Sequence, residues 1–251
     1  LSFDEDEAED LLKEIEKSLK KRQWGEVIRL EVEYGIDKRL LAFLKDELRI
    51  ESEDDIFKIN GPIDLTYLMK MYGLEGCDDL RYKPYTPQPV PQIPQGSNIF
   101  DAIKKGDILL HHPYQTFDPV VEFIRQAAKD PDVLAIKQTL YRVSGNSPII
   151  ASLAQAAENG KQVSVLVELK ARFDEENNIV WAKKLEKAGC HVIYGLVGLK
   201  THSKIALVVR REEEGICRYV HLGTGNYNDS TAKLYTDCGI FTCSEAIGED
   251  A

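Results

Sequence analysis

Residues 198–209 read GLKTHSKIALVV, and residues 219–228, further along, read YVHLGTGNYN. The first stretch places His202 and Lys204 two positions apart at the start of an apolar run typical of a β-strand. Because side chains alternate along a strand, we expect both residues to face the same side of a sheet. The second stretch is a Gly-rich turn with Asn226, a kind of backbone that can approach an anion closely. Together they favour phosphoryl chemistry on a histidine, with a half-buried histidine on an ordinary strand as the alternative.

Strand-like and helix-like segments alternate around this stretch. Strands are expected at 133–142, 163–169, 191–194, 203–210, 216–222 and 235–241, and helices at 99–105, 117–129, 147–160 and 175–188. This alternation predicts an α/β fold with a mixed, mostly parallel sheet covered by helices on both faces. In such folds ligands bind at the carboxyl ends of the strands, and Arg142 and Arg172 each follow such an end.

The preceding residues predict a smaller α+β segment. Its expected elements are helices at 4–22 and 37–48, a strand at 24–30 and a short helix from residue 61. Residues 83–94 contain five prolines, which disfavour regular helix or sheet and predict an extended linker. We therefore expect two parts, residues 1–95, which end in this linker, and the α/β domain at 96–251.

Charge is distributed unevenly along the chain. The formal net charge is −10, and residues 1–80 account for all of it, with 12 Lys and Arg against 22 Asp and Glu. Residues 133–235 carry 14 basic against 10 acidic residues, a net of +4. The overall acidity argues against a nucleic-acid partner, whereas the basic part is compatible with a polyanionic ligand.

The cysteines and the hydropathy pattern indicate in which cellular compartment we expect the protein. Five cysteines form no C-x-x-C pair, so we expect neither a zinc site nor a disulfide framework, and a reducing cytoplasm is favoured. No apolar run approaches the length of a transmembrane span, and the chain begins with an acidic segment rather than a signal peptide.

Five motifs together resemble those of the bacterial long-chain polyphosphate kinases, which belong to the phospholipase D-like superfamily. They are LLHHPY at 109–114, KQTLYR at 137–142, ELKARFDE at 168–175, KTHSK at 200–204 and HLGTGNYN at 221–228. Each is weak alone, but five in order are a specific signal. The resemblance implies that residues 1–95 correspond to the end of the family's head domain and 96–251 to its first C-terminal catalytic domain.

The resemblance also implies an activity and its residues. The family moves the terminal phosphate of ATP reversibly onto polyphosphate through a phosphohistidine, and His202 matches that nucleophile. Lys204 is the candidate cation beside it, with a solvated lysine at a strand edge as the alternative. Arg142 and Arg172 match the two arginines of the magnesium–phosphate site. Since a guanidinium cannot ligate a metal, we expect both to clamp phosphate beside Mg²⁺, whose direct protein ligands the sequence does not identify. The alternative for both is a surface arginine paired with a neighbouring acid.

Three further residues match positions near the family's site. Tyr235 matches the tyrosine that stacks on adenine, with a core-facing tyrosine as the alternative. His221 and Asn226 are candidate site residues, and a structural role at a strand end is an equal alternative for His221. The implied ligands are ATP or ADP, polyphosphate and Mg²⁺. The implied full-length protein is a cytoplasmic homo-oligomer, with membrane association left open.

Two departures from the superfamily pattern matter. Phospholipase D-like motifs place an Asp five residues after the Lys, where this chain has Val209. A phosphodiesterase is therefore less favoured than a kinase. A non-catalytic module that binds polyphosphate is the other alternative. The family also uses an N-terminal domain and a second half with another histidine and more arginines. Because these 251 residues match neither region, we expect a piece of a longer polypeptide that is inactive alone.

Overall fold

The computed structural model describes residues 11–22, 24–83, 85–143, 146–171, 174–195 and 198–251. These residues form two compact units, one built around residues 18–83 and the other around 85–251 together with the first part of helix α1 (Leu11–Arg22). Within the described residues no helix is both long enough and apolar enough to cross a bilayer.

The smaller unit contains a parallel pair of strands joined through a helix. Strand β1 (Leu30–Glu33) pairs with β2 (Ile56–Ile59), and α2 (Lys38–Glu47) lies between them in the chain. Asp37 caps α2, because its carboxylate accepts hydrogen bonds from the N–H groups of Arg39 and Leu40 at 2.8 and 3.1 Å. The short elements η1 (Glu53–Asp55), α3 (Leu68–Met71) and η2 (Asp78–Leu80) complete the unit.

Three predictions for this unit are wrong or incomplete. The strand expected at 24–30 begins only at residue 30, and the short helix expected from residue 61 begins at residue 68. Strand β2 was not expected, because its four residues IFKI are too short to show a clear period.

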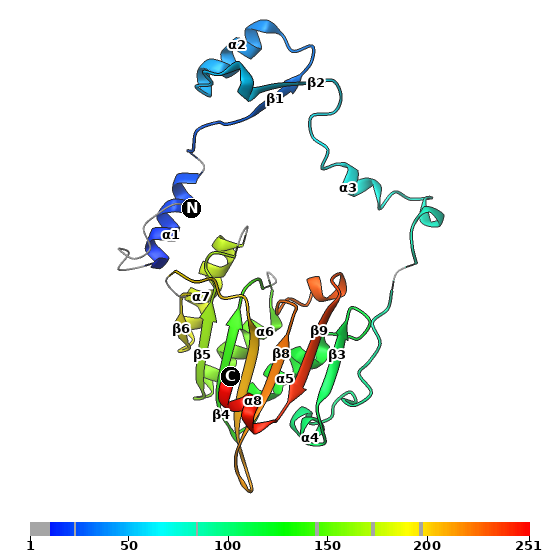
Figure 1. Ribbon diagram of the computed structural model, residues 1–251, viewed down its shortest axis with the longest axis vertical. Helices are drawn as coiled ribbons and strands as arrows, with labels where there is room; N and C mark the ends of the chain where they lie inside the picture. Colours follow the sequence, from blue (N-terminus) through cyan, green and yellow to red (C-terminus); the bar gives the residue numbers. More distant parts are fainter. Residues whose placement is uncertain (1–10, 23, 84, 144–145, 172–173, 196–197) are drawn as a thin grey trace. The chain divides into compact units, whose positions relative to one another are not determined.

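The larger unit is a seven-stranded sheet in the order β3-β9-β8-β7-β4-β5-β6 (Figure 1). The strands are β3 (Ile108–His112), β4 (Val133–Leu140), β5 (Gln162–Val167), β6 (His191–Ile193), β7 (Lys204–Glu212), β8 (Gly215–Gly223) and β9 (Asp237–Thr242). The helices are α4 (Ile99–Lys104), α5 (Asp118–Lys129), α6 (Pro148–Glu158), α7 (Glu175–Lys187), α8 (Glu245–Asp250) and the one-turn η3 (Thr231–Lys233).

The mixed α/β class is confirmed, but the expectation of a mostly parallel sheet is wrong. Only β4–β5 and β5–β6 pair in parallel, whereas β3–β9, β9–β8, β8–β7 and β7–β4 are antiparallel. No helix separates β7 from β8, which form a tight hairpin with Glu212 opposite Gly215. Consecutive strands without a crossover helix must run antiparallel, and the alternation of strands and helices ends at β6.

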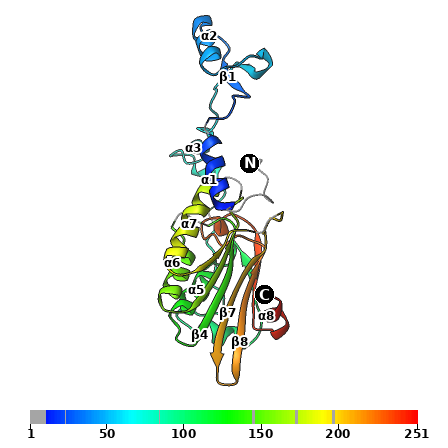
Figure 2. The same cartoon turned by 90° about the vertical axis from the view of Figure 1, so that its left-hand side faces the viewer.

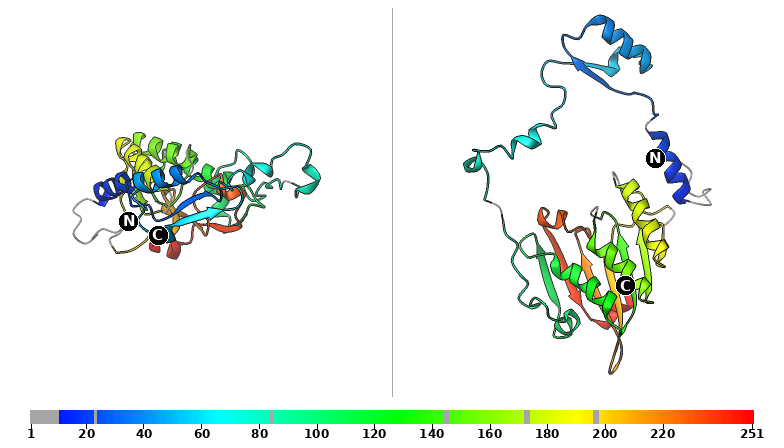
Figure 3. Two further views of the ribbon diagram at one scale, coloured as in Figure 1. Left: turned by 90° about the horizontal axis from the view of Figure 1, so that it is seen from above. Right: turned by 180° about the vertical axis from the view of Figure 1, so that it is seen from behind.

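Helices cover the two faces of the sheet unequally. Figure 2 shows α5, α6 and α7 on one face and the short α8 on the other, and Figure 3 shows the helical layer from behind. Under this layer the aromatic rings of Phe100 and Phe123 pack with Tyr219 and Phe241, at centroid distances of 4.9 to 5.9 Å. These four side chains are at most 1 % exposed and form the centre of the core.

Helix boundaries follow the predicted capping residues. The hydroxyl of Ser147 accepts a hydrogen bond from the N–H of Ile150 at 3.3 Å, and Pro148 occupies the first turn of α6. Gly160 and Gly189 follow α6 and α7 with φ of 82° and 93°, a conformation that disfavours residues with a Cβ. These predicted helix ends are confirmed.

Candidate active site at the ends of β4, β5 and β7

The antiparallel pairing of β7 with β4 brings the start of β7 to the edge where β4 and β5 end. Gln138 of β4 lies opposite Ala206 of β7. The loop residues that precede β7, which include His202, therefore lie beside the residues that follow β4, which include Tyr141. The prediction that candidate residues gather at this edge agrees with the geometry, although His202 reaches it from the amino end of its strand.

His202 lies in a loop and not on a strand. Strand β7 begins two residues later, so side-chain alternation does not apply to His202 and that expectation is wrong. Thr139 fixes the loop to β4, because its hydroxyl donates to the carbonyl of Ser203 at 2.8 Å and accepts from the N–H of Ile205 at 3.0 Å. The imidazole meets the Tyr141 ring edge-on, with centroids 4.9 Å apart and planes at 82°.

Three cations gather around the same tyrosine ring. The ammonium of Lys204 lies 5.1 Å from the ring centroid of Tyr141, that of Lys200 lies 5.5 Å away, and the Arg142 guanidinium carbon lies 5.6 Å away. These distances are within the range of cation–π attraction. His202 and its cations therefore converge on Tyr141, a residue that the sequence analysis did not single out.

This environment favours the neutral form of the His202 imidazole. Partial burial lowers the pKa of His202, and the positive charges of Lys204, Lys200 and Arg142 lower it further. A neutral ring nitrogen keeps the lone pair that a nucleophile needs. The geometry thus agrees with the predicted chemistry for His202.

Lys204 is almost completely buried, with 5 % of its surface exposed. Burial lowers the pKa of its ammonium, and the nearby carboxylate of Asp237 opposes that shift. Its Nζ donates to the carbonyl of His202 at 2.5 Å. The alternative of a solvated lysine at a strand edge is therefore wrong, and the cation is held in place beside the histidine.

Glu168, just past the end of β5, is a buried acid that contacts the His202 loop. Its side chain is 2 % exposed. One carboxylate oxygen accepts a hydrogen bond from the N–H of Thr201 at 2.7 Å, and the other accepts one from the N–H of Lys170 at 2.9 Å. Its own backbone N–H donates to the carbonyl of Leu140 at 2.9 Å.

Asn178 of α7 forms hydrogen bonds to the residues that follow β4 and β5. Its side-chain amide donates to the carbonyl of Tyr141 at 2.6 Å and to the carbonyl of Glu168 at 2.9 Å. Only 1 % of the residue is exposed. Buried carbonyl groups require such partners, so Asn178 stabilises the two strand ends against each other.

The predicted arginines have different outcomes. Arg142 lies at the site and forms an ion pair with Asp174 at 3.2 Å, which is the pairing that its alternative interpretation expects. Both side chains are about one-third exposed, at 38 % and 30 %. Arg172 lies outside the described residues, so its predicted role remains a prediction.

His221 and Asn226 line a separate, nearly filled cavity. His221 is 3 % exposed, its Nδ1 lies 3.0 Å from the Tyr227 hydroxyl, and burial with a further contribution from His112 lowers its pKa to about 3. The cavity that both line holds about 10 Å³, which is too small for a nucleotide. These contacts agree with the structural alternative for His221.

Tyr235 lies on the surface between η3 and β9. It is 61 % exposed, so the alternative of a core-facing tyrosine is wrong. An exposed ring remains able to stack on a base, and adenine binding at Tyr235 stays a prediction.

The described residues do not supply a protein cage for Mg²⁺. Nowhere in the described ranges do three or more His, Cys, Asp or Glu side chains group together as metal ligands. Glu168 uses both oxygens on backbone N–H groups, and Asp174 faces Arg142. The cations of the site fit phosphate oxygens instead, so any Mg²⁺ would be held mainly by phosphate and water.

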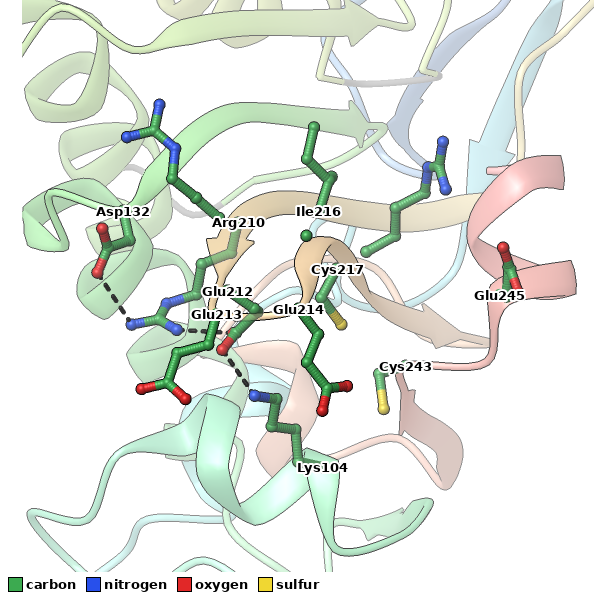
Figure 4. A pocket seen from close by; sticks show the side chains of 13 residues that line it. Lys104, Asp132, Arg210, Glu212, Glu213, Glu214, Ile216, Cys217, Cys243 and Glu245 are labelled. Carbon is green, nitrogen blue, oxygen red and sulfur yellow. Dashed lines mark hydrogen bonds and ion pairs between the residues drawn. The ribbon is translucent and has the colours of Figure 1, made fainter.

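A wider cavity of about 910 Å³ lies at the opposite end of β7 and β8 (Figure 4). Four of its charged groups pair with one another: Arg210 binds Glu212 at 2.6 Å and Asp132 at 3.5 Å, and Lys104 binds Glu212 at 2.6 Å. None of the predicted site residues lines it. We therefore place the candidate site at the His202 edge.

Five contributors were not among the residues predicted from the sequence: Tyr141, Lys200, Glu168, Asn178 and Thr139. Four of them lie inside the motifs given above, at 137–142, 168–175 and 200–204. The motifs therefore contained these residues, but a single tyrosine, threonine, lysine or glutamate has no characteristic spacing from which a role can be predicted. Asn178 lies mid-helix and reaches strand ends 37 and 10 residues away, which only the tertiary structure shows.

Comparison with known proteins agrees with the motif resemblance. Residues 98–251 match the family model "Polyphosphate kinase C-terminal domain 1", and residues 1–71 match "Polyphosphate kinase middle domain". The polyphosphate kinase of Halalkalibacterium halodurans is 61 % identical over all of this chain, and that of Exiguobacterium sibiricum is 60 % identical. This chain spans only 36 % and 35 % of these two relatives.

A solved structure shows the same fold. The crystal structure of polyphosphate kinase from Porphyromonas gingivalis matches with a TM-score of 0.69 and 32 % sequence identity. The match covers 88 % of this chain and 34 % of that one.

Proposed function

The chain belongs to the polyphosphate kinase family, and from this membership we propose that it is the part of such a kinase that carries the nucleophilic histidine. The observation that carries the proposal is the His202 imidazole against Tyr141, in a cluster with Lys204, Lys200 and Arg142, whose charges lower its pKa. Phosphoryl transfer needs an in-line nucleophile and cations on the phosphate oxygens, and this edge of the sheet offers both.

The proposed reaction has two balanced steps. A ring nitrogen of His202 attacks the terminal phosphorus of ATP, an N–P bond forms, and ADP leaves with the electrons of the broken P–O bond. A terminal oxygen of polyphosphate then attacks the phosphohistidine, which restores the neutral imidazole. Mg²⁺ carried on the nucleotide would neutralise phosphate charge.

The residues of this chain have distinct tasks in the proposal. Lys204 and Lys200 bind phosphate oxygens, and Arg142 clamps a phosphate with its planar fork. Tyr141 supports the imidazole by its edge-on contact and gathers the cations on its ring. Tyr235 stacks on the adenine.

A phosphodiesterase is the less favoured function. The position at which phospholipase D-like motifs carry an acid is Val209, which lies inside β7 between Ala135 and Arg218 of the neighbouring strands. A purely binding module would keep the cations and need no neutral histidine. Incubation with a phosphodiester and with ATP separately distinguishes these functions.

The test is phosphorylation of His202 in a polypeptide of the relatives' full length that carries this chain. With radiolabelled ATP and Mg²⁺ we expect an acid-labile, base-stable label that His202→Ala abolishes together with polymer synthesis. His191→Ala, at the exposed edge strand β6, is the matched control and should keep both. Full labelling in His202→Ala contradicts the assignment.

A further inference from the structure

The loop that carries His202 is held by few backbone contacts to the sheet. Residues 198–203 precede β7, and the ladder between β4 and β7 begins only at the Gln138–Ala206 pair. On the β4 side, Thr139 holds Ser203 and Ile205. On the other side of His202, the N–H of Thr201 donates to Glu168.

Glu168 joins its own segment after β5 to three others: the His202 loop, the end of β4 and helix α7. Its carboxylate accepts from the N–H of Thr201 in the His202 loop and from the N–H of Lys170 after β5. Its backbone N–H donates to Leu140 at the end of β4, and its backbone carbonyl accepts from Asn178 of α7. Oε1 also lies 4.0 Å from the point that a Cβ on Gly195 would occupy, so the chain passes closely after β6.

The burial of this acid points to a positioning role rather than to a ligand contact. A carboxylate that is 2 % exposed is turned into the protein, and its negative charge would repel a phosphate. Each oxygen already accepts one backbone N–H, and hydrogen bonds to an ionised acceptor are roughly twice as strong as neutral ones. Such a group fixes backbone, because releasing either N–H would leave a buried charge poorly satisfied.

We propose that Glu168 is the positioning residue of the nucleophile: its buried carboxylate holds the Thr201 backbone so that the His202 imidazole stays against Tyr141 and between the cations. The proposal rests on the proposed function, since it assigns Glu168 a role in the reaction of His202. It adds a residue that contacts neither phosphate nor base.

Glu168→Gln tests the proposal with a minimal change of shape. The amide keeps one acceptor oxygen but turns an NH₂ group toward one of the two backbone N–H donors. In the full-length polypeptide we expect the single-turnover rate of His202 phosphorylation to fall roughly 10- to 100-fold, because small misplacement of a nucleophile has effects of that size. The KM for ATP should change less than about threefold, since Glu168 does not touch the nucleotide.

Amide hydrogen exchange on the 251-residue chain supplies the second readout. In Glu168→Gln we expect the N–H groups of Thr201 and Lys170 to lose protection by roughly tenfold or more, while those of Val165 and Leu207 in the sheet stay unchanged. Glu176→Gln, an exposed acid on α7, makes the same chemical change and should affect neither readout.

Three results would overturn the proposal. Unchanged protection of Thr201 means that Glu168 does not hold the loop. A uniform loss of protection that includes Val165 and Leu207 means a general effect on folding. A rise in KM with an unchanged phosphorylation rate means that Glu168 serves ATP binding. If the wild-type protein is not phosphorylated on His202, the proposed function fails, and the exchange pattern still decides whether Glu168 holds Thr201.

Discussion

At the scale of single residues, His202 must meet two requirements: positive charge nearby to bind phosphate, and a neutral imidazole to act as nucleophile. A phosphate-binding site needs positive charge, and positive charge lowers the pKa of a neighbouring imidazole. Here the two requirements agree, because a lowered pKa keeps the nucleophile neutral at physiological pH. Lys204 serves both requirements, because its buried ammonium is a cation for phosphate and also lowers the pKa of His202.

Replacing Lys204 by Met should raise the pKa of His202. Burial is the largest cause of the lowered pKa and persists in the variant, so the pKa should move toward its ordinary value without a complete return. At a pH near the ordinary histidine pKa, more of the His202 population should then be protonated. An NMR titration of the 251-residue chain measures this, with the exposed His191 as internal control. An unchanged or lower His202 pKa in Lys204→Met would contradict the assigned environment.

Replacing Arg142 by Lys should keep the charge and lose the planar fork. We expect a loss of transition-state stabilisation of roughly 2–4 kcal/mol, similar to the removal of one oxyanion donor, and the same for Arg172→Lys. The ratio of kcat/KM in the full-length polypeptide gives this value, with the exposed Arg211→Lys as control. Turnover near the wild-type level in both variants would leave these arginines as surface ion-pair partners.

At the scale of elements, one ionic network ties the far end of the sheet to its helices. Arg210 of β7 pairs with Asp130 after α5 at 2.9 Å and with Glu212 at 2.6 Å, while Lys104 of α4 and the Tyr219 hydroxyl also bind Glu212. Burial alone would raise the pKa of Glu212, but the hydrogen bonds from Lys104, Tyr219 and Arg210 together lower it to about 2. This network explains the charged cavity in Figure 4 without a ligand.

The Glu212 network should therefore stabilise the fold in a pH-dependent way. The folded-state pKa of about 2 lies below the ordinary glutamate value of 4.5, so the stabilisation is complete above pH 4.5 and is lost as pH falls toward 2. Its full size is on the order of 3 kcal/mol. In urea unfolding, Glu212→Gln should be less stable than wild type at pH 7, and the difference should shrink as pH falls toward 3. Glu213→Gln, an exposed neighbour, should show no such pattern; a pH-independent difference for Glu212→Gln would show that packing rather than charge is lost.

At the scale of the whole molecule, the charge is divided between the parts of the chain. All of the net negative charge is carried by residues 1–80, whereas residues 133–235 are net positive and contain the His202 edge. The described cations of the candidate site follow the end of β4, lie in the loop before β7 or begin β7 itself, on one edge of one sheet. The chain spans about a third of the curated relatives that it matches.

The isolated 251-residue chain should bind polyphosphate weakly and should not synthesise it. Binding that depends mainly on charge is screened by salt, so the affinity should fall steeply between low and high ionic strength. Turnover should be absent, because transfer of a highly charged phosphoryl group needs cations on both sides of the reacting phosphorus. A titration with polyphosphate at two salt concentrations, beside a synthesis assay, tests both parts. Sustained turnover by this chain would show that one edge of cations is sufficient.

The sequence alone was enough for the α/β class and most helix ends, and it singled out His202 and Lys204, whose roles stay predictions. Helix ends were predictable because Ser147, Gly160 and Gly189 act through local backbone geometry, which needs no knowledge of the rest of the fold. His202 and Lys204 were singled out because they lie two residues apart and because the five motifs together resemble those of one family.

The tertiary structure decided what depends on pairing between distant segments. The sheet is mostly antiparallel because β7 and β8 form a hairpin and because β9 pairs antiparallel with β8 and β3, with no crossover α-helix before either β8 or β9 that could return the chain in parallel. The contacts of His202 with Tyr141, of Thr201 with Glu168, and of Asn178 with two strand ends join residues from different elements. The role of a buried polar group can be inferred only from its hydrogen-bond partners. Here the His202 loop and the residues after β4 come together because β7 pairs antiparallel with β4.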